Sequence, residues 1–355
     1  MKFTKMHGAG NDFIIINNME EKLPIEGFNE LAKKLCHRRF SIGADGLMVV
    51  EHPSAEVEDR STGYSNKIKI SSTEGDCART FATNIEARAT NAEVQNCDFR
   101  MLFYNADGSV GEMCGNGARC IARYGYEHGL AEKVQRIETL SGIVEGQRVT
   151  DKKYKVRLNP VTKMDLDCVE IQMPNLSIQS KVSYVELGNP GLPHAVVECK
   201  GLQNIVENLK LDELKALGKR LRYHEAFPKG ANVNFYEIIG EDELYILTYE
   251  RGVEDFTLAC GTGTASTVAV LAEQGLVSGH GVRVHAAGGD LAVDVVNKRS
   301  ETVDVVDKKN EAANVIAEKF QIETSASGVL VDVTKQHLYL TGEAEIVAEG
   351  EILHI

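Results

Sequence analysis

The chain has 355 residues, which at about 150 residues per domain indicates two domains. Hydrophobic residues make up 43% and charged residues 26% of the chain, as in ordinary globular proteins. The formal net charge of −13 disfavours a nucleic-acid partner, because such proteins present a basic face. No apolar stretch reaches the roughly 18 residues of a membrane-spanning helix, so we also expect no membrane partner.

Strand-like runs alternate with shorter helical runs along the chain. A helix is predicted at residues 28–36. Strands are predicted at residues 2–6, 12–17, 48–50, 101–104, 155–158, 184–187, 233–239 and 244–249. The alternation predicts an α/β or α+β fold.

The sequence contains an internal repeat. Cys114-Gly115-Asn116-Gly117 begins one predicted helix, and Cys260-Gly261-Thr262-Gly263 begins another. In both copies, glycines follow the cysteine after 15 and 28 residues. These glycines are Gly129 and Gly142 in the first copy, and Gly275 and Gly288 in the second. The matched spacing predicts two homologous, pseudo-symmetric halves that each present one cysteine.

The repeat also predicts the domain boundaries. The first half is expected at residues 1–158 together with a returning segment at about 344–355, and the second half at 159–343. Two polar segments, 57–98 and 297–333, interrupt the pattern. We predict that both are insertions at surface loops.

A cysteine directly before a Gly-x-Gly helix start suits acid–base chemistry. The amides of a helix N-terminus bind a carboxylate and favour a thiolate over a thiol. Two such cysteines could remove a proton from one face of a carbon and deliver one to the opposite face. This is two-base epimerisation, which needs no cofactor. The alternative for each cysteine is a small buried core residue.

The remaining cysteines give weaker signals. The chain has eight cysteines without a Cys-x-x-Cys pair, and its amino terminus lacks the apolar run of a signal peptide, so we expect reduced thiols in the cytoplasm. Cys120 is predicted to lie in the core, and Cys114 with Cys120 is a poor zinc pair, so no metal site is expected. Cys77 and Cys97 could form a redox pair, although surface or core thiols are the commoner case.

Seven segments of the chain resemble the diaminopimelate epimerase family and occur in family order. They are His7–Phe13, Gly43–Gly46, Tyr104–Ser109, Met113–Cys120, Phe227–Phe235, Tyr249–Val253 and Ala259–Gly263. The resemblance implies a PLP-independent isomerase that interconverts LL- and meso-diaminopimelate in lysine and peptidoglycan-precursor biosynthesis. It also implies a homodimer and two α/β domains, each a curled sheet or barrel around a central helix, with the active site in the cleft between them.

The resemblance further assigns roles to individual residues. Cys114 and Cys260 would exchange the roles of base and acid, and His194 and Glu250 would tune the two thiols. The reacting carboxylate would be bound by Gly115, Asn116, Gly261 and Thr262. The distal amino-acid end would be bound by Asn11, Asn105, Asn189, Asn232, Glu250 and Arg251. The segment Gly188–His194 departs from the uninterrupted Gly-Asn-Pro-His of many members, which affects the assignment of Asn189.

Other functions fit parts of the same pattern. A related racemase could act on another amino acid, such as histidine, with only the distal contacts changed. Proline racemase and hydroxyproline epimerase also use two cysteines, but they carry Met-Cys-Gly-His-Gly where this chain has Asn116. From a different class, a non-catalytic amino-acid-binding protein or a thiol redox protein would tolerate the loss of either cysteine.

Overall fold

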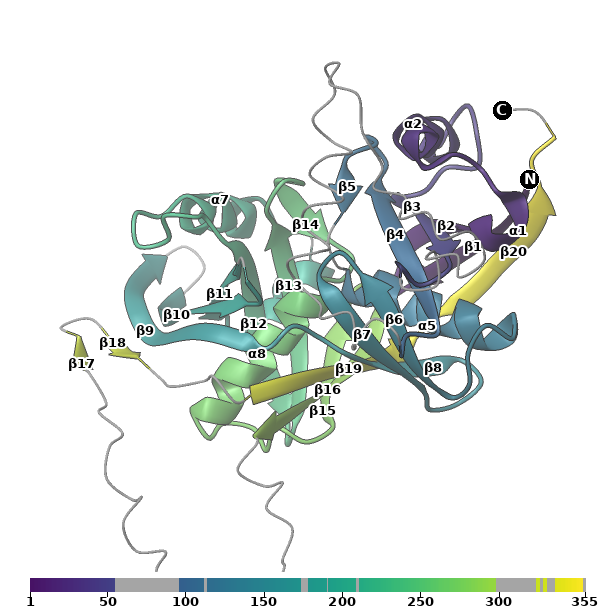
Figure 1. The fold of residues 1–355 in the computed structure, drawn as a ribbon. Coiled ribbons are helices and arrows are strands. Elements are labelled where there is room, and N and C mark those ends of the chain that lie inside the picture. The colour runs from purple at the N-terminus through teal and green to yellow at the C-terminus, as the bar shows by residue number, and fades with distance from the viewer. Residues whose placement is uncertain are drawn as a thin grey trace, which may run out of the picture. The chain divides into compact units, whose positions relative to one another are not determined.

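The computed structural model describes residues 1–54, 96–111, 114–173, 178–189, 191–208, 211–297, 324–325, 328–330 and 336–353. The chain forms two compact units, Met1–Arg157 with Thr341–Ile355 and Leu158–Leu340. Strands and helices are mixed in both units, which confirms the α/β class (Figure 1). Within the described residues, no helix is both long and apolar enough to cross a membrane.

The first unit consists of a mainly antiparallel sheet and its helices. Its strands are β1 (Lys2–Gly8), β2 (Asn11–Asn17), β3 (Gly46–Glu51), β4 (Phe99–Asn105), β5 (Val110–Gly111), β6 (Val134–Thr139), β7 (Gly142–Arg148), β8 (Lys153–Arg157) and β20 (Glu345–Glu351). Its helices are α1 (Asn18–Glu21), η1 (Ile25–Gly27), α2 (Phe28–Cys36) and α5 (Gly115–Glu127).

The sheet of the first unit curls around helix α5. Its strands follow the order β20-β1-β2-β3-β4-β6-β7-β8, and only the β2–β3 and β4–β6 pairs are parallel. Helix α5 packs against β1 and β2 and also against β7 and β8, near the other end of this order. The helix is buried on almost all sides because glycine, alanine and cysteine make it thin.

Both faces of the central strands are buried, which explains their apolar runs. Ile14 and Ile16 of β2 lie in one cluster with Leu31 and Leu35 of α2. The adjacent Phe13 points to the other face, where it approaches Gly117 of α5. A strand that is covered on both faces has no polar face to alternate with, so the sequence reads as a continuous apolar run.

The second unit also contains a sheet and a thin helix. Its strands are β9 (Val161–Met173), β10 (Ile178–Leu187), β11 (Leu192–Glu198), β12 (Asn232–Gly240), β13 (Glu243–Glu250), β14 (Asp255–Thr257), β15 (Val282–Ala286), β16 (Gly289–Asn297), β17 (Thr324–Ser325) and β18 (Gly328–Leu330). Its helices are α6 (Leu202–Glu207), α7 (Leu211–Arg222) and α8 (Gly261–Glu273). Strand β19 (Gln336–Glu343) carries the chain from this unit into the first.

The strand order of the first unit recurs in the second. Here the order is β9-β10-β11-β12-β13-β15-β16, and only the β11–β12 and β13–β15 pairs are parallel. Helix α8 packs against β9, β10, β11, β12 and β16, as α5 does in its own unit. The repeat seen in the glycine spacing therefore extends to the order and direction of the strands.

Several expectations are extended or corrected by the structure. Every predicted strand is present, mostly one to four residues longer, and the predicted helix 28–36 has the observed bounds of α2. The sequence reasoning did not predict α7 or the long strand β9. The described strands of neither unit close into a ring, so the sheets are curled but are not barrels.

The end of the chain returns to its beginning. Strand β20 pairs with β1 in antiparallel orientation, and both termini lie in the first unit (Figure 1). The unit boundaries fall after Arg157 and after Leu340. The predicted insertions, 57–98 and 297–333, lie almost entirely outside the described residues, as does Cys77.

Candidate active site

Each unit places one cysteine at the start of its central helix. Cys114 precedes α5 with an extended backbone (φ −130, ψ 121), and Cys260 precedes α8 in the same way (φ −112, ψ 105). The carbonyl of Cys114 accepts the Ala118 amide at 2.8 Å, and that of Cys260 accepts the Thr264 amide at 2.8 Å. Both helices begin where the sequence predicts. The first-turn amides of each helix are therefore close to a sulfur atom.

The Cys114 thiol is held by a chain of polar side chains. Its Sγ donates to Oδ1 of Asn11 at 3.3 Å. Nδ2 of Asn11 donates to Oδ2 of Asp45 at 2.6 Å. Because a carboxylate only accepts hydrogen bonds, Asp45 fixes which end of the Asn11 amide faces the sulfur.

Two cations neutralise the carboxylates behind this chain. Arg38 Nη2 lies 2.7 Å from Oδ1 of Asp45 and 2.7 Å from Oδ1 of Asp12. Lys5 Nζ lies 2.7 Å from Oδ2 of Asp12. Burial would raise the pKa of Asp12, but the hydrogen bonds from Arg38 and Lys5 outweigh burial and hold that pKa well below its usual range. Asp12 is therefore anionic at neutral pH. Asp45 accepts hydrogen bonds from both Arg38 and Asn11, which keeps the Asn11 amide in this orientation.

Asn105 lies at the same end of the sheet as Asn11. It is the last residue of β4 and pairs with Gly46, the residue after Asp45. The Ala106 amide donates to the carbonyl of Asp45 at 3.1 Å, which joins the two segments. The first unit thus gathers three of its predicted site residues around Asp45: Asn11, Asn105 and Cys114.

Arg119 is buried in the first turns of α5. Its Nη1 donates to the carbonyl of Gly115 at 3.3 Å, and its Nη2 donates to Oδ1 of Asn116 at 3.0 Å. The guanidinium is fully buried, which lowers the pKa of Arg119. The side chain of Asn116 is thereby fixed, and its backbone amide remains in the first turn of the helix.

Cys260 makes a different set of contacts from Cys114. Its Sγ accepts the Gly263 amide at 3.4 Å and lies 3.5 Å from Oγ1 of Thr262. The sulfur thus caps its own helix, whereas the Cys114 side chain bonds to Asn11 instead. A backbone N–H directed at a sulfur stabilises negative charge on it.

A buried polar layer lies behind Cys260. His194 is fully buried in β11, opposite Asn232 of β12. Nδ2 of Asn234 lies 3.3 Å from Nδ1 of His194 and donates to the carbonyl of Ala195 at 3.1 Å. Burial and the nearby Arg251 charge lower the pKa of His194 to about 3, so the ring is neutral. Among the described residues, none hydrogen-bonds to its buried Nε2.

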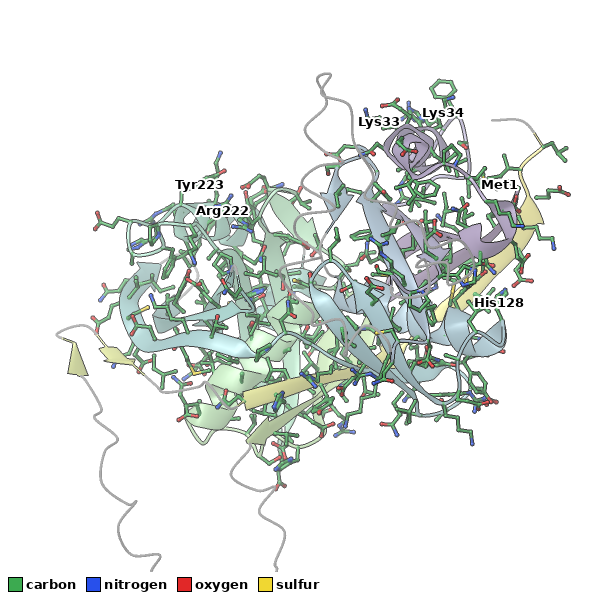
Figure 2. The ribbon with its side chains drawn as sticks, viewed as in Figure 1. Met1, Lys33, Lys34, His128, Arg222 and Tyr223 are labelled. Carbon is green, nitrogen blue, oxygen red and sulfur yellow. The ribbon has the colours of Figure 1, made fainter. Side chains whose placement is uncertain are left out.

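The tight turn after β13 brings three predicted residues together. The Arg251 amide donates to Oδ1 of Asn232 at 2.8 Å, and Glu250 ends the strand one residue earlier. The guanidinium of the exposed Arg251 reaches the carbonyl of Lys229 at 3.3 Å. Arg222, labelled at the end of α7 in Figure 2, fixes this turn through an ion pair of 3.2 Å with Glu254.

Asn189 lies apart from these contacts. It is exposed in the turn after Gly188, just before β11. The second unit therefore gathers most of its predicted site residues around two features. These are the start of α8, with Cys260, Gly261 and Thr262, and the β11–β13 edge, with His194, Asn232, Glu250 and Arg251.

Sequence reasoning missed three residues that support the site. Asp45, Arg119 and Asn234 all lie inside the motifs that carry the family resemblance. A polar residue within a motif was the only available signal, because burial and partners are not visible in a sequence. In the part of the chain that the structure describes, no cluster of three or more His, Cys, Asp or Glu side chains could hold a metal ion, and no disulfide joins two of the seven described cysteines.

The sequence matches known proteins over most of its length. The family model for diaminopimelate epimerase matches residues 3–164 and 188–312. Diaminopimelate epimerase of Alkaliphilus metalliredigens is 35% identical over 308 residues, which cover 83% of this chain and 90% of that protein. Diaminopimelate epimerase of Aquifex aeolicus is 33% identical over 301 residues, which cover 82% and 88% of the two chains.

Solved structures share the fold at low sequence identity. A PhzF-family phenazine biosynthesis protein from Bacillus anthracis has a TM-score of 0.59 at 15% identity, covering 100% of this chain and 99% of that one. A probable proline racemase from Agrobacterium radiobacter has a TM-score of 0.53 at 15% identity, covering 100% and 93%. These likenesses concern the fold alone, whereas the family match spans most of the sequence. The chain belongs to the diaminopimelate epimerase family.

Proposed function

We propose that this chain interconverts LL- and meso-diaminopimelate by two-base proton transfer at Cα, with Cys114 and Cys260 as the two bases. The observation that carries the proposal is the placement of both cysteines directly before the central helices of two units with the same strand order. The family membership supports the substrate, and it relates the reaction to lysine biosynthesis.

The chemistry follows from the groups at the two helix starts. One cysteine, as a thiolate, takes the Cα proton, and the other, as a thiol, delivers a proton to the opposite face. The electron pair left on Cα spreads onto the α-carboxylate. First-turn amides at Gly115, Asn116, Gly261 and Thr262 would stabilise that charge. After one turnover the thiol and the thiolate have exchanged places, so each cysteine serves as the acid in one direction and the base in the other.

The distal end of the substrate needs an ammonium site and a carboxylate site. Glu250 suits the ammonium, and Arg251 suits the carboxylate because guanidinium binds carboxylate through two parallel hydrogen bonds. Asn11, Asn105, Asn189 and Asn232 would add neutral hydrogen bonds. Both sulfurs would need to reach the same substrate Cα, with water excluded from the reacting proton. His194, neutral and buried beside Asn234, would act on Cys260 through the polar layer.

Deuterium exchange tests the reaction and the two bases together. LL-diaminopimelate is incubated with reduced enzyme in D₂O, and deuterium at Cα and the LL-to-meso ratio are followed. The variants are Cys114→Ala and Cys260→Ala, with Cys168→Ala as a control for a half-buried thiol outside the site. We expect deuterated meso product from the parent and the control, and a loss of epimerisation of at least 1000-fold in each site variant, about 4 kcal/mol of barrier.

The other outcomes separate the alternatives. Exchange with histidine or another amino acid, but not with diaminopimelate, would keep the two-base reaction and assign it another substrate. Epimerisation that survives the loss of either cysteine would contradict the two-base mechanism. Binding of diaminopimelate without any exchange would favour a non-catalytic binding protein. The homodimer and the cytoplasmic location stay predictions, which sedimentation and cell fractionation would test.

A further inference from the structure

The two helix starts differ at the fifth residue after the cysteine. In α5 that residue is Arg119, and in α8 it is Ala265. Arg119 is fully buried, and its Nε has no hydrogen-bond partner within the described part of the chain. Its two bonds go to the neutral oxygens of Gly115 and Asn116, and no described carboxylate forms an ion pair with it.

A buried cation in this position is doubly unfavourable. Removing a guanidinium from water costs free energy, and arginine does not give up its proton to avoid that cost. The positive end of the helix dipole lies in the same turn. An anion nearby would offset both effects. Burial lowers the pKa of Arg119, whereas negative charge on Cys120 and then on Cys114 raises it, so charge on either sulfur interacts favourably with the guanidinium.

The Asn11 side chain acts on the same sulfur in the opposite sense. Oδ1 of Asn11 accepts the thiol proton of Cys114, and Asp45 holds the amide in that orientation. A carbonyl oxygen stabilises a thiol and repels a thiolate. The amide could turn its N–H toward the sulfur only by placing Oδ1 against the Asp45 carboxylate.

The other charged groups around α5 are mutually paired or lie beyond these contacts. On the sheet strands β1 and β2, Lys5 and Asp12 pair with each other, and Arg38 bridges Asp12 and Asp45. Further groups on these strands and on the helix include His7 of β1, Glu145 of β7 paired with Arg157 of β8, and Arg123 of α5 paired with Glu345. The buried Cys120 interacts with both Arg119 and Cys114, but burial raises its pKa to about 12, so its thiol stays uncharged between pH 5 and 10. Arg119 bonds to the first turn of α5, and the Asn11–Asp45 pair bonds to the sulfur itself, so these groups act on Cys114 through contacts at the helix start.

We infer that Arg119 and Asp45 are positioning residues that act on Cys114 in opposite senses, Arg119 favouring its thiolate and Asp45, through Asn11, favouring its thiol. The inference rests on the proposed two-base mechanism, in which Cys114 is a base in one direction and an acid in the other. Two opposing influences keep both protonation states accessible. The Cys260 sulfur instead accepts the Gly263 amide.

The test measures thiol reactivity at each cysteine separately. Reduced enzyme is pulsed with iodoacetamide between pH 5 and 10, and mass spectrometry gives the alkylation rates of Cys114 and Cys260. The midpoint is the pH at which the alkylation rate of a cysteine reaches half its maximum. Arg119→Met should raise the Cys114 midpoint by about one pH unit or more, because the substitution removes a buried positive charge. Asp45→Asn should move it downward by less than about one unit, because Asp45 is partly exposed. Arg119→Lys should restore most of the parent midpoint.

Cys260 is the internal control in every sample. Its midpoint should stay within about 0.2 pH units of the parent value, since both substitutions lie in the other unit. The inference would be overturned if the Cys114 midpoint shifted in the same direction in both variants or did not shift. It would also be overturned if Cys114 and Cys260 shifted equally. If Arg119→Met does not fold, Arg119→Gln removes the charge, keeps N–H donors, and should give the same upward shift.

The assay also separates this inference from the proposed function, because alkylation needs no turnover. Opposite shifts at Cys114 in an enzyme that epimerises nothing would overturn the function and leave the residue assignment standing. If epimerisation requires both cysteines but the two variants do not shift Cys114 in opposite directions, the proposed function stands and the assignment of Arg119 and Asp45 is overturned. A purely structural role of Arg119 predicts lower activity with an unchanged pH profile, whereas the inference predicts an alkaline shift of kcat in Arg119→Met.

Discussion

The side chain of Asn234 occupies the space that any side chain on Gly263 would need. An ideal Cβ on Gly263 would lie 2.2 Å from Oδ1 of Asn234 and 3.2 Å from Sγ of Cys260. Asn234 in turn bonds to His194, Ala195 and Thr248. The first turn of α8 is therefore packed directly on the buried polar layer, and the second glycine of the Cys-Gly-x-Gly motif is a packing requirement.

Gly263→Ala should for this reason damage both the fold and the reaction. The added methyl group overpacks the turn, which we expect to cost about 1–3 kcal/mol of unfolding free energy. Epimerase activity should fall at least tenfold in the protein that remains folded. Gly27→Ala is the matched control, because nothing lies within 4 Å of a Cβ at Gly27. Urea unfolding and the exchange assay measure the two effects, and parent-like values for Gly263→Ala would contradict the packing argument.

His194 should make the protein less stable as the pH falls. Its pKa is about 3 in the folded protein and 6.5 in an unfolded chain, because burial and Arg251 disfavour the charged ring. Between these values the unfolded state binds a proton that the folded state does not. The unfolding free energy should therefore fall by up to about 1.4 kcal/mol per pH unit as the pH drops from about 6.5.

His194→Gln provides the comparison for that slope. Glutamine cannot titrate in this range, so the variant should lose less stability than the parent between pH 6.5 and 4.5 in urea unfolding experiments. An identical slope in the two proteins would show that His194 does not titrate differently in the folded and unfolded states.

His285 should have the opposite pH dependence. Hydrogen bonds to Glu243 and then to Asp290 raise its pKa above 6.5. The stabilisation is complete below pH 6.5 and is lost as the pH rises through the folded-state pKa. Because the ring is partly exposed, we expect only about 0.5–1 kcal/mol. The parent should lose this unfolding free energy between pH 6 and 9 in urea unfolding experiments, and His285→Gln should not. If the variant loses as much unfolding free energy as the parent, His285 is not the cause.

Mild oxidation should test whether the two sulfurs reach a common carbon. If Cys114 and Cys260 both reach Cα, diamide should form a disulfide between them and reduce activity at least tenfold, with recovery in dithiothreitol. Peptide mapping would identify the cross-link, and Cys168→Ala should behave like the parent. Full activity after oxidation, with both thiols still available for alkylation, would contradict the proposed two-base site.

Much of the fold was predictable because its signals are local. The apolar run at Phe13–Ile16, the Cys-Gly-x-Gly helix starts and the glycines behind them depend on neighbouring residues alone. The repeat was visible because both halves keep the same spacing. Helix α7 was not predicted, although its leucines at 214, 217 and 221 have helical spacing and are buried.

The site was predictable only as a set of positions. The sequence identifies Cys114 and Asn11 within separate motifs, but the hydrogen bond between them spans 103 residues. Asp45 reaches Asn11 across 34 residues, through the parallel pairing of β2 with β3. Arg119 lies within a recognised motif, but only the structure shows that its guanidinium is fully buried.

The sequence by itself determined the position of α2, of the two helices behind the cysteines and of eight strands, which residues repeat, and which family the motifs resemble. These properties arise from backbone preferences and short-range periodicity, which act within a few residues. Only the tertiary structure decided which groups surround each cysteine: Asn11 with Arg119 for Cys114, and Gly263 with the Asn234 layer for Cys260. Burial and long-range pairing set those partners, because desolvation and hydrogen-bond geometry depend on neighbours that are distant in the sequence.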